Sequence, residues 1–460
     1  MIDFKQQFKG KKITVMGLGL LGRGLGYTKF LAECGADLIV TDLKTKEQLA
    51  TSIKKLEKFP SIKFVLGEHR LEDFRNRDMI IKSAGVPFDS IYIAEARKNN
   101  IPIEMDVSLF AKLAPDVMII GVTGTRGKSM TTALIYEILS AYVKASAGQE
   151  KKWKVYLGGN VRGVATLPLL EKVQAGDILV CELDSWQLQG FGEAKISPHI
   201  SVFTSFMPDH MNYYKDDIKA YFADKANIFK YQKSEDILII RPDMKELIPE
   251  YFKNLPAGRQ GKLIVVSAKD TKNYEFVVPG EYQRENLACA VAVAGEFGVP
   301  EESIKKAVRN FKGLEGRLQY VKTIKGVKIY NDNNATTPEA TMVGIEALVS
   351  PKSDLEGKKI VLICGGADKG LKLDNFTEVV EKYCKAVVLI PGTGTDILSS
   401  RKLKVESYKV KDLNEAVKTA LGLASRGDII LFSPAFASFG MFNNEYERND
   451  LFLEIIKELK

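Results

Sequence analysis

The sequence predicts an α/β protein of three domains, because strand-like and helical segments alternate along most of its length. Continuous apolar runs flanked by helical patterns are typical of parallel strands covered on both faces. The clearest runs are Ile13–Met16, Leu38–Thr41, Met79–Ile81, Val117–Ile120, Ile178–Cys181, Ile237–Ile240, Ile360–Cys364, Ala386–Ile390 and Ile429–Phe432. The chain has 460 residues, and roughly 100–200 residues per domain favours about three domains.

Two boundaries follow from the order of these segments. One alternating series ends between Asp106 and Pro115, and a second opens at Val117. The other boundary lies near Gly313–Arg317, and a closing helix is expected from Glu445 onward. We expect a Rossmann-like domain, a central P-loop domain with a mostly parallel sheet, and a Rossmann-like C-terminal α/β domain, over residues 1–106, 107–314 and 315–460.

The composition is that of an ordinary globular chain, with 45% apolar and 27% charged residues, which argues against disordered and fibrous proteins. The net charge of +8 is a weak excess that fits acidic small ligands as well as nucleic acid. The five cysteines form no CxxC pair, so we expect buried free thiols in a reducing compartment. The start lacks a secretory signal, and no apolar run reaches membrane-span length, which predicts a cytoplasmic protein that does not enter a membrane.

The first glycine-rich turn follows the first strand and reads Gly17-Leu-Gly19-Leu-Leu-Gly22. Such a turn before a helix presents free backbone N–H groups to an anion, and Asp42 ends the next strand where a ribose binds in dinucleotide enzymes. The same pattern also fits a turn that binds nothing. An NAD site is disfavoured because a stronger nucleotide signal follows.

That second signal is Gly121-Val-Thr-Gly124-Thr-Arg-Gly127-Lys128-Ser129, between a buried strand and a helix. The loop's N–H groups would cradle phosphates, Lys128 would neutralise their charge, and the Ser129 hydroxyl would bind Mg²⁺. Val122 stands where the strict P-loop pattern has glycine. The sequence therefore predicts binding of ATP or GTP with magnesium.

The form GxTGTxGK[ST]T resembles one branch of P-loop proteins, the Mur ligases and folylpolyglutamate synthetases, which are ATP-dependent amide ligases. Later segments agree in the same order and cover essentially the whole chain. They contain Glu182 in VCELDSWQLQGF, Asp209-His210 in FTSFMPDHMNYY, Lys225 in YFADKANIF, Asn286 before LACAVAVA, Arg317 in GLEGRLQYV and Asp332 in VKIYNDNNATTPEA. Three more segments resemble the Mur ligases that add D-glutamate to UDP-N-acetylmuramoyl-L-alanine. These are GLGLLGRG with Asp42, the SAGV turn at Ser83–Val86, and LFSPAFASFGMF at 431–442.

The resemblance implies an amide ligase of peptidoglycan precursor synthesis that works through an acyl phosphate and a tetrahedral intermediate. Its catalytic residues would be Lys128, Glu182, His210 and Lys225. Ser129, Glu182, His210 and a carbamylated Lys225 would hold Mg²⁺, at two sites. The implied ATP-binding residues are Gly124, Thr125, Arg126, Gly127, Lys128, Ser129, Asn286, Arg317 and Asp332. The UDP-substrate would contact Leu20, Leu21, Asp42, Gly85 and Asn160, and the amino acid would contact Thr336, Lys369 and Ser438.

Plainer roles exist for single residues of this set. Glu182 could be a solvent-facing charge at the end of a strand, and His210 could be an ordinary loop histidine. Lys225 could lie on a solvated helix face. Lys369 could likewise be a solvated turn lysine. The ordered succession after a P-loop favours the metal and ligand roles.

Several positions depart from the family pattern. Arg126 replaces a usual asparagine, Gln283 replaces the asparagine that accompanies Asn286, and Glu315-Gly316 precedes Arg317 in place of a Pro-His pair. Asn334 replaces a lysine near ATP or the glutamate. Glu445 aligns with a phenylalanine that backs the amino-acid pocket, and an acid there would repel the side-chain carboxylate of glutamate.

Two alternatives therefore stay open beside a D-glutamate ligase. One is a Mur-like or folylpolyglutamate-type ligase with a different amino acid or acceptor. The other is a nucleotide-binding partner protein without catalysis. For the ligase we expect small-molecule substrates (UDP-N-acetylmuramoyl-L-alanine, D-glutamate and ATP), no nucleic acid, and a monomer.

Overall fold

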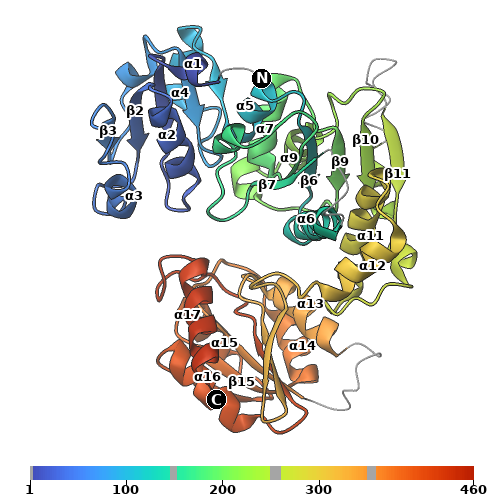
Figure 1. The fold of residues 1–460 in the computed structure, drawn as a ribbon. Helices are drawn as coiled ribbons and strands as arrows, with labels where there is room; N and C mark the ends of the chain where they lie inside the picture. The colour runs from blue at the N-terminus through green and yellow to red at the C-terminus, as the bar shows by residue number, and fades with distance from the viewer. Residues whose placement is uncertain (1–3, 146–152, 249–260, 350–358, 460) are drawn as a thin grey trace. The chain divides into compact units, whose positions relative to one another are not determined.

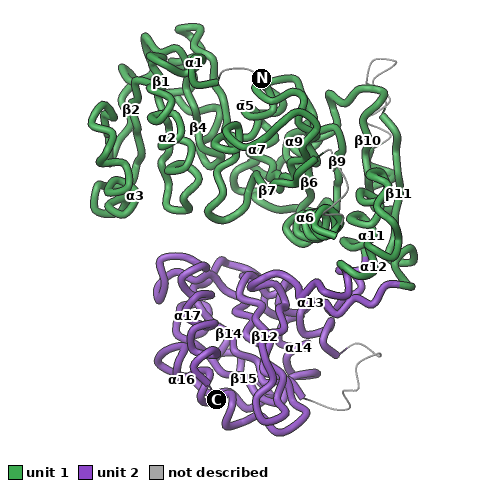
Figure 2. The backbone as a smooth tube through the Cα atoms, viewed as in Figure 1, with its two compact units in different colours: residues 1–273, 285–307 green, residues 274–284, 308–460 purple. Residues whose placement is uncertain are grey.

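The computed structural model describes residues 4–145, 153–248, 261–349 and 359–459, and it has an α/β fold with three sheets (Figure 1). The chain forms two compact units, residues 1–273 with 285–307 and residues 274–284 with 308–460 (Figure 2). Unit 1 holds two sheets and unit 2 holds the third. The α/β class is thereby confirmed, while the predicted boundaries at residues 106 and 314 stay predictions.

The first sheet of unit 1 is fully parallel, in the order β3-β2-β1-β4-β5. Its strands are β1 (Lys12–Met16), β2 (Asp37–Asp42), β3 (Lys63–Leu66), β4 (Met79–Lys82) and β5 (Ile103–Glu104). Its helices are α1 (Phe4–Phe8), α2 (Arg23–Glu33), α3 (Ala50–Lys54) and α4 (Ile91–Lys98), whereas α5 (Asp106–Leu113) follows β5 and packs against the helix at Ser185–Ala194. Strand β1 lies between β2 and β4. The strand order therefore reverses at β1, the strand that the first glycine-rich turn follows.

The second sheet is also parallel, in the order β11-β10-β9-β6-β8-β7. Its strands are β6 (Met118–Thr123), β7 (Val155–Gly159), β8 (Ile178–Glu182), β9 (Ile200–Phe203), β10 (Ile237–Ile240) and β11 (Lys262–Val265). Its helices are α6 (Lys128–Ala145), α7 (Ser185–Ala194), α8 (Met211–Tyr214) and α9 (Ile218–Ala226), followed by α11 (Glu281–Glu296) and α12 (Glu301–Asn310), which have residues in both units. Strand β6 lies between β8 and β9, so the second glycine-rich turn also leaves a point where the order reverses.

The third sheet, in unit 2, is mixed and has the order β12-β13-β17-β14-β15-β16. Its strands are β12 (Gln319–Ile324), β13 (Val327–Asn331), β14 (Ile360–Gly365), β15 (Cys384–Ile390), β16 (Glu406–Lys409) and β17 (Ile429–Phe432), of which β12 and β13 pair antiparallel. The helices are α13 (Pro338–Leu348), α14 (Asp374–Tyr383), α15 (Thr393–Ser400), α16 (Leu413–Leu423) and α17 (Glu445–Glu458). The antiparallel edge differs from a purely parallel Rossmann-like domain.

The core of unit 2 lies on both faces of this sheet, because alternate side chains of a strand point to opposite faces. Leu362 of β14 belongs to one apolar cluster, and its neighbour Val361 belongs to the other. In the second cluster Phe432 stacks on Phe452 of α17 with ring centres 4.4 Å apart. Both faces are therefore covered, as the continuous apolar runs predict.

The five cysteines are all buried and free, as expected from their spacing. Within the described ranges, no helix has the length and apolar character that crossing a membrane requires.

Candidate active site

The first glycine-rich turn is held by the carboxylate of Asp42, at the end of β2. One Asp42 oxygen accepts a hydrogen bond from Gly19 N–H at 2.9 Å, and the other accepts one from Lys44 N–H at 2.9 Å. Gly17 has φ 96°, and a Cβ at this position would come within 2.4 Å of Ser83 Oγ. The turn thus packs closely against the SAGV turn after β4, which includes the exposed Gly85.

These contacts bring together four residues predicted to bind the UDP part. Leu20 and Leu21 remain 51% and 39% exposed beside the Asp42 carboxylate, although both are large apolar side chains. Exposed apolar residues next to a fixed carboxylate suit a flat ring that has polar groups at its edge. The fifth predicted contact, Asn160, follows β7, and its side-chain N–H₂ is 3.3 Å from Glu182 Oε1.

The second glycine-rich turn joins β6 to α6 and is fixed by the segment after β9. Thr125 N–H donates to the Ser205 carbonyl at 2.8 Å, and Arg126 N–H donates to Ser205 Oγ at 2.9 Å. Gly127 has φ 89°, and a Cβ there would lie 2.4 Å from Asn286 Oδ1 of α11. The structure therefore places Asn286 against the P-loop glycine.

Two lysine side chains meet at one carbonyl oxygen of this turn. Lys128 Nζ and Lys225 Nζ each lie 2.9 Å from the Gly124 carbonyl oxygen. Lys225, on α9, is 1% exposed, and its Nζ lies 4.8 Å from the centre of the Tyr221 ring. Burial, reinforced by the positive charge of Lys128, lowers the pKa of Lys225 well below the ordinary lysine value. The interpretation of Lys225 as a solvated lysine is therefore wrong.

Glu182 ends β8, next to the P-loop strand, and is 6% exposed, so its interpretation as a solvent-facing charge is wrong as well. His210 directly precedes α8 and has φ 55°, and the centre of its ring lies 4.8 Å from that of Trp186. Burial lowers the pKa of His210. The negative charge of Asp209 opposes this lowering, and the positive charges of Lys128 and Lys225 add to it. Within the described residues, no hydrogen bond joins Glu182 to His210 or to Lys225.

The donor chemistry at this point fits Mg²⁺ on one condition. Among the described side chains, no group of three or more His, Cys, Asp or Glu residues lies close enough to hold a metal ion. Glu182 and Ser129 offer oxygen atoms, which Mg²⁺ prefers, whereas an unmodified Lys225 offers none. A carbamate on Lys225 would supply the missing anionic oxygens, so the residues fit the metal when that modification is present.

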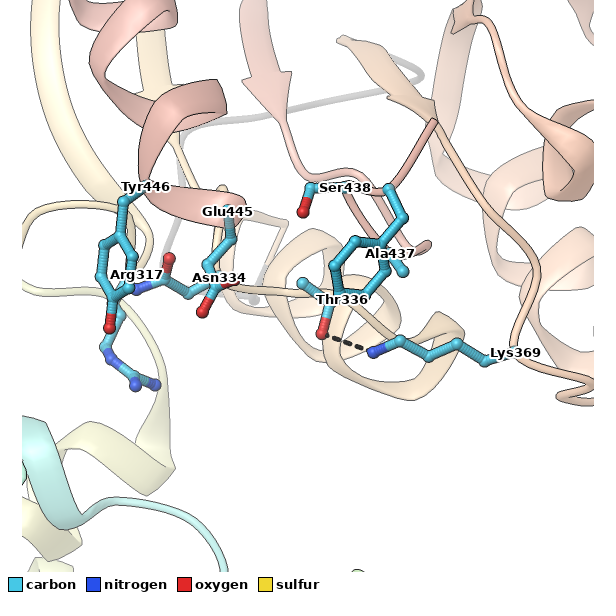
Figure 3. Close-up of a pocket in the computed structure, with 9 residues that line it drawn as sticks. Arg317, Asn334, Thr336, Lys369, Ala437, Ser438, Glu445 and Tyr446 are labelled. Carbon is cyan, nitrogen blue, oxygen red and sulfur yellow. Dashed lines mark hydrogen bonds between the residues drawn. The ribbon is translucent and has the colours of Figure 1, made fainter. Parts of the chain in front are cut away.

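Unit 2 contains a pocket of about 270 Å³ at the ends of β13, β14 and β17 (Figure 3). It is lined by Arg317, Asn334, Thr336, Lys369, Ala437, Ser438, Phe439, Glu445 and Tyr446. Lys369 Nζ donates to Thr336 Oγ1 at 3.0 Å, as the dashed line shows. The structure thus brings together all three residues expected to contact the amino acid, together with Arg317 and the two divergent positions Asn334 and Glu445.

Asp332 lies outside the set that lines this pocket and is 8% exposed. Its carboxylate accepts hydrogen bonds from Leu318 N–H at 2.9 Å and from Ser433 Oγ–H at 2.8 Å. Burial nevertheless raises the pKa of Asp332 to about 7, and the two hydrogen bonds and Arg317 oppose that rise. The protonated form is therefore retained in the folded state well above the pH at which an unfolded aspartate ionises.

This raised pKa predicts a pH-dependent stability difference between the wild type and Asp332→Asn. The folded state holds the Asp332 proton more tightly than the unfolded state, so this residue's stabilisation is complete at low pH and is lost as the pH rises toward 7. Between pH 5 and pH 8 the wild type should lose about 2–3 kcal/mol of unfolding free energy relative to Asp332→Asn. Urea denaturation at both pH values measures this difference, and parallel changes in the two proteins would contradict it.

Two residues that shape the pocket wall are absent from the predicted site. Arg448 of α17 is fully buried and donates to Asn333 Oδ1 at 2.8 Å and to the Asn333 carbonyl at 3.0 Å. Asn333 Nδ2 in turn donates to Asn334 Oδ1 at 3.1 Å and to the Glu445 carbonyl at 2.9 Å. Both are polar residues in otherwise ordinary segments, and no sequence pattern marks them as partners.

Family models match three consecutive parts of the chain. The Mur ligase MurD-like N-terminal domain matches residues 11–104, the Mur ligase middle domain matches residues 122–274, and the Mur ligase glutamate ligase domain matches residues 316–436. Together they cover the first glycine-rich turn, the second turn from Val122 onward, and four of the nine residues that line the pocket in unit 2.

Curated proteins of similar sequence match along the full length. A UDP-N-acetylmuramoylalanine–D-glutamate ligase of Roseiflexus sp. (strain RS-1) is 36% identical, with 98% of this chain and 99% of that protein covered. The enzyme of the same name from Borreliella afzelii (strain PKo) is 33% identical over 98% of this chain and 99% of its own.

Solved structures show the same fold. The UDP-N-acetylmuramate–alanine ligase MurC of Thermotoga maritima has a TM-score of 0.59 at 21% identity, with 98% of this chain and 100% of that chain covered. The MurF ligase of Thermotoga maritima, solved in complex with ADP, has a TM-score of 0.56 at 17% identity, with 99% and 96% covered.

Proposed function

The chain belongs to the Mur ligase family, and from that premise we propose that it joins D-glutamate to UDP-N-acetylmuramoyl-L-alanine, driven by ATP, in peptidoglycan precursor synthesis. The observation that carries the proposal is the pocket of unit 2. Lys369 and Thr336, a cation and a hydroxyl suited to carboxylates, line it inside the segment that matches the glutamate ligase domain. The relatives named for this reaction match the chain over 98% of its length.

The reaction must first activate the substrate carboxylate, which is a poor electrophile. Transfer of the ATP γ-phosphate to the substrate carboxylate would give an acyl phosphate, and attack by the glutamate amine would then form a tetrahedral intermediate that releases phosphate. The first step brings two anions together, so positive charge at that point is the main requirement. Mg²⁺ held by Ser129, Glu182, His210 and a carbamate of Lys225 would supply part of that charge.

The chain's own groups supply the rest of the positive charge and hold the substrates. The N–H groups of Gly127, Lys128 and Ser129, at the start of α6, would face the phosphates. Lys128 would exchange its hydrogen bond to the Gly124 carbonyl for phosphate oxygens, which are stronger acceptors. Asn286, Arg317 and Asp332 would contact the rest of ATP. On the substrate side, Leu20, Leu21, Asp42, Gly85 and Asn160 would hold UDP-N-acetylmuramoyl-L-alanine.

Carbamylation of Lys225 is chemically reasonable at this position. Carbon dioxide reacts with an unprotonated amine, and burial lowers the pKa of Lys225 well below its ordinary value. The product is an anion, and its oxygen atoms could face the positive charges of Lys128 and Mg²⁺. We propose further that the protein acts as a monomer in the cytoplasm and binds no nucleic acid.

The reaction is tested by phosphate release from ATP with UDP-N-acetylmuramoyl-L-alanine and a panel of amino acids. We expect turnover that depends on D-glutamate. Glu445 favours a second candidate, a ligase for another amino acid, because it places an acid on the pocket wall. Turnover with another amino acid alone would support that candidate, and ATP binding without turnover on any amino acid would support a partner protein without catalysis.

A further inference from the structure

The unit 2 pocket has an uneven distribution of charge (Figure 3). Its lining contains the cations Arg317 and Lys369 and the hydroxyls of Thr336 and Ser438, and Glu445 is the one acid among the nine residues that line it. An amino acid with a carboxylate side chain carries two negative groups and one ammonium group at neutral pH. The cations and hydroxyls of the pocket suit the two carboxylates of such an amino acid, which leaves the role of Glu445 to be explained.

The backbone of Glu445 is fixed, whereas its carboxylate is not engaged. Its carbonyl accepts the hydrogen bond from Asn333 Nδ2, and Asn444 caps α17 directly before it. Across the residues that the structure describes, the Glu445 carboxylate makes no hydrogen bond and no ion pair, and the backbone carbonyl is the residue's only hydrogen-bonded acceptor. By contrast, the ammonium group of Lys369 already donates to Thr336.

The negative charge of Glu445 is favourable at this place without a direct ion pair. Glu445 is the first residue of α17, where the helix dipole favours a negative charge. The buried guanidinium of Arg448 lies one helical turn further and interacts electrostatically with Glu445. The Glu445 carboxylate can therefore remain on the pocket wall without a hydrogen bond or ion pair of its own.

We propose that the Glu445 carboxylate accepts hydrogen bonds from the α-ammonium group of the incoming amino acid. This makes the pocket select an amino acid over a dicarboxylic acid of the same length. The acid that would repel a carboxylate then serves as an orienting group, because glutamate must turn its ammonium group toward Glu445 and its carboxylates toward Lys369 and Thr336. Glu445 is a specificity-determining and positioning residue, and no chemical step is assigned to it. The inference rests on the proposed function.

The test compares glutamate with glutarate, which has both carboxylates but no ammonium group. The variants are Glu445→Gln, which keeps the size and removes the charge, and Glu454→Gln, which removes an exposed acid of the same helix. In Glu445→Gln the KM for D-glutamate should rise about tenfold, as expected for loss of a hydrogen bond to a charged group. Inhibition by glutarate should stay equal or become tighter, because a repelling charge is gone, and the KM for ATP should not change.

The outcomes separate the inference from the proposed function. If Glu445→Gln weakens the binding of glutamate and glutarate equally, or changes the binding of neither, the proposed role of Glu445 is overturned. D-Glutamate-dependent turnover of the wild type would still uphold the ligase function in that case. Absence of D-glutamate-dependent turnover in the wild type would overturn both. Glu454→Gln should behave as the wild type, and a Glu445→Asp variant that regains part of the preference for glutamate over glutarate would exclude a merely structural effect.

Discussion

Replacement of Lys225 by alanine is expected to reduce D-glutamate-dependent turnover about 10²–10³-fold, the usual effect of removing one group that stabilises charge in a transition state. Lys225 is fully enclosed, and its Nζ lies 2.9 Å from the Gly124 carbonyl of the phosphate-binding turn. If its carbamate is a metal ligand, alanine removes two oxygen atoms and a negative charge from the place where two anions must meet. The KM for D-glutamate should change little, because Lys225 does not line the pocket of unit 2.

The measurement is the rate of phosphate release, repeated with a small added carboxylate such as acetate or formate. An added carboxylate that occupies the vacated space should restore part of the activity of Lys225→Ala and leave the wild type unaffected. Lys219→Ala, which removes an exposed lysine from the same helix, is the matched control and should keep full activity. Near-normal turnover of Lys225→Ala would refute the proposed role, and thermal denaturation shows whether the variant folds.

Replacement of Lys128 by methionine should be at least as damaging to turnover, by about 10²–10³-fold. Lys128 is the first residue of α6, and its ammonium group folds back on the turn, 2.9 Å from the Gly124 carbonyl and 3.2 Å from the Thr125 carbonyl. Methionine keeps the length of the side chain but cannot neutralise phosphate charge. Unlike Lys225→Ala, this variant should also bind ATP more weakly.

Steady-state rates together with calorimetric ATP binding separate these two effects. Lys144→Ala, which changes an exposed lysine near the end of the same helix, should alter neither quantity. ATP affinity and turnover of Lys128→Met close to the wild-type values would show that this turn does not hold the triphosphate.

The parts of the fold that sequence reasoning could predict are those encoded by contiguous segments. The run Ile178–Cys181 is continuous and apolar because β8 is covered on both faces, and the glycine-rich turn from Gly121 to Ser129 carries its own pattern. Strand β3 (Lys63–Leu66) carries no such signal, since it lies at a sheet edge and is only half-buried. The antiparallel pairing of β12 with β13 likewise depends on tertiary placement.

The pocket shows the same division. Resemblance to a family pointed to Thr336, Lys369 and Ser438, which the structure brings to one cavity. The contact of Arg448 with Asn333 joins residues 115 positions apart, so no local pattern could predict it. The burial of Lys225 could not be predicted from the sequence either, because a lysine on a helix is normally solvated. Only the surrounding fold encloses this side chain.

The most direct test of the acyl-phosphate ligase is the isotopic content of the phosphate that it releases. UDP-N-acetylmuramoyl-L-alanine with ¹⁸O in its alanine carboxylate would be incubated with ATP, Mg²⁺ and D-glutamate, and the phosphate analysed by mass spectrometry. Transfer of the γ-phosphate to the carboxylate, followed by cleavage of the carbon–oxygen bond, predicts one ¹⁸O atom in each phosphate released with the amide product. Formation of the amide with unlabelled phosphate, or release of phosphate without an amide, would contradict the proposed mechanism.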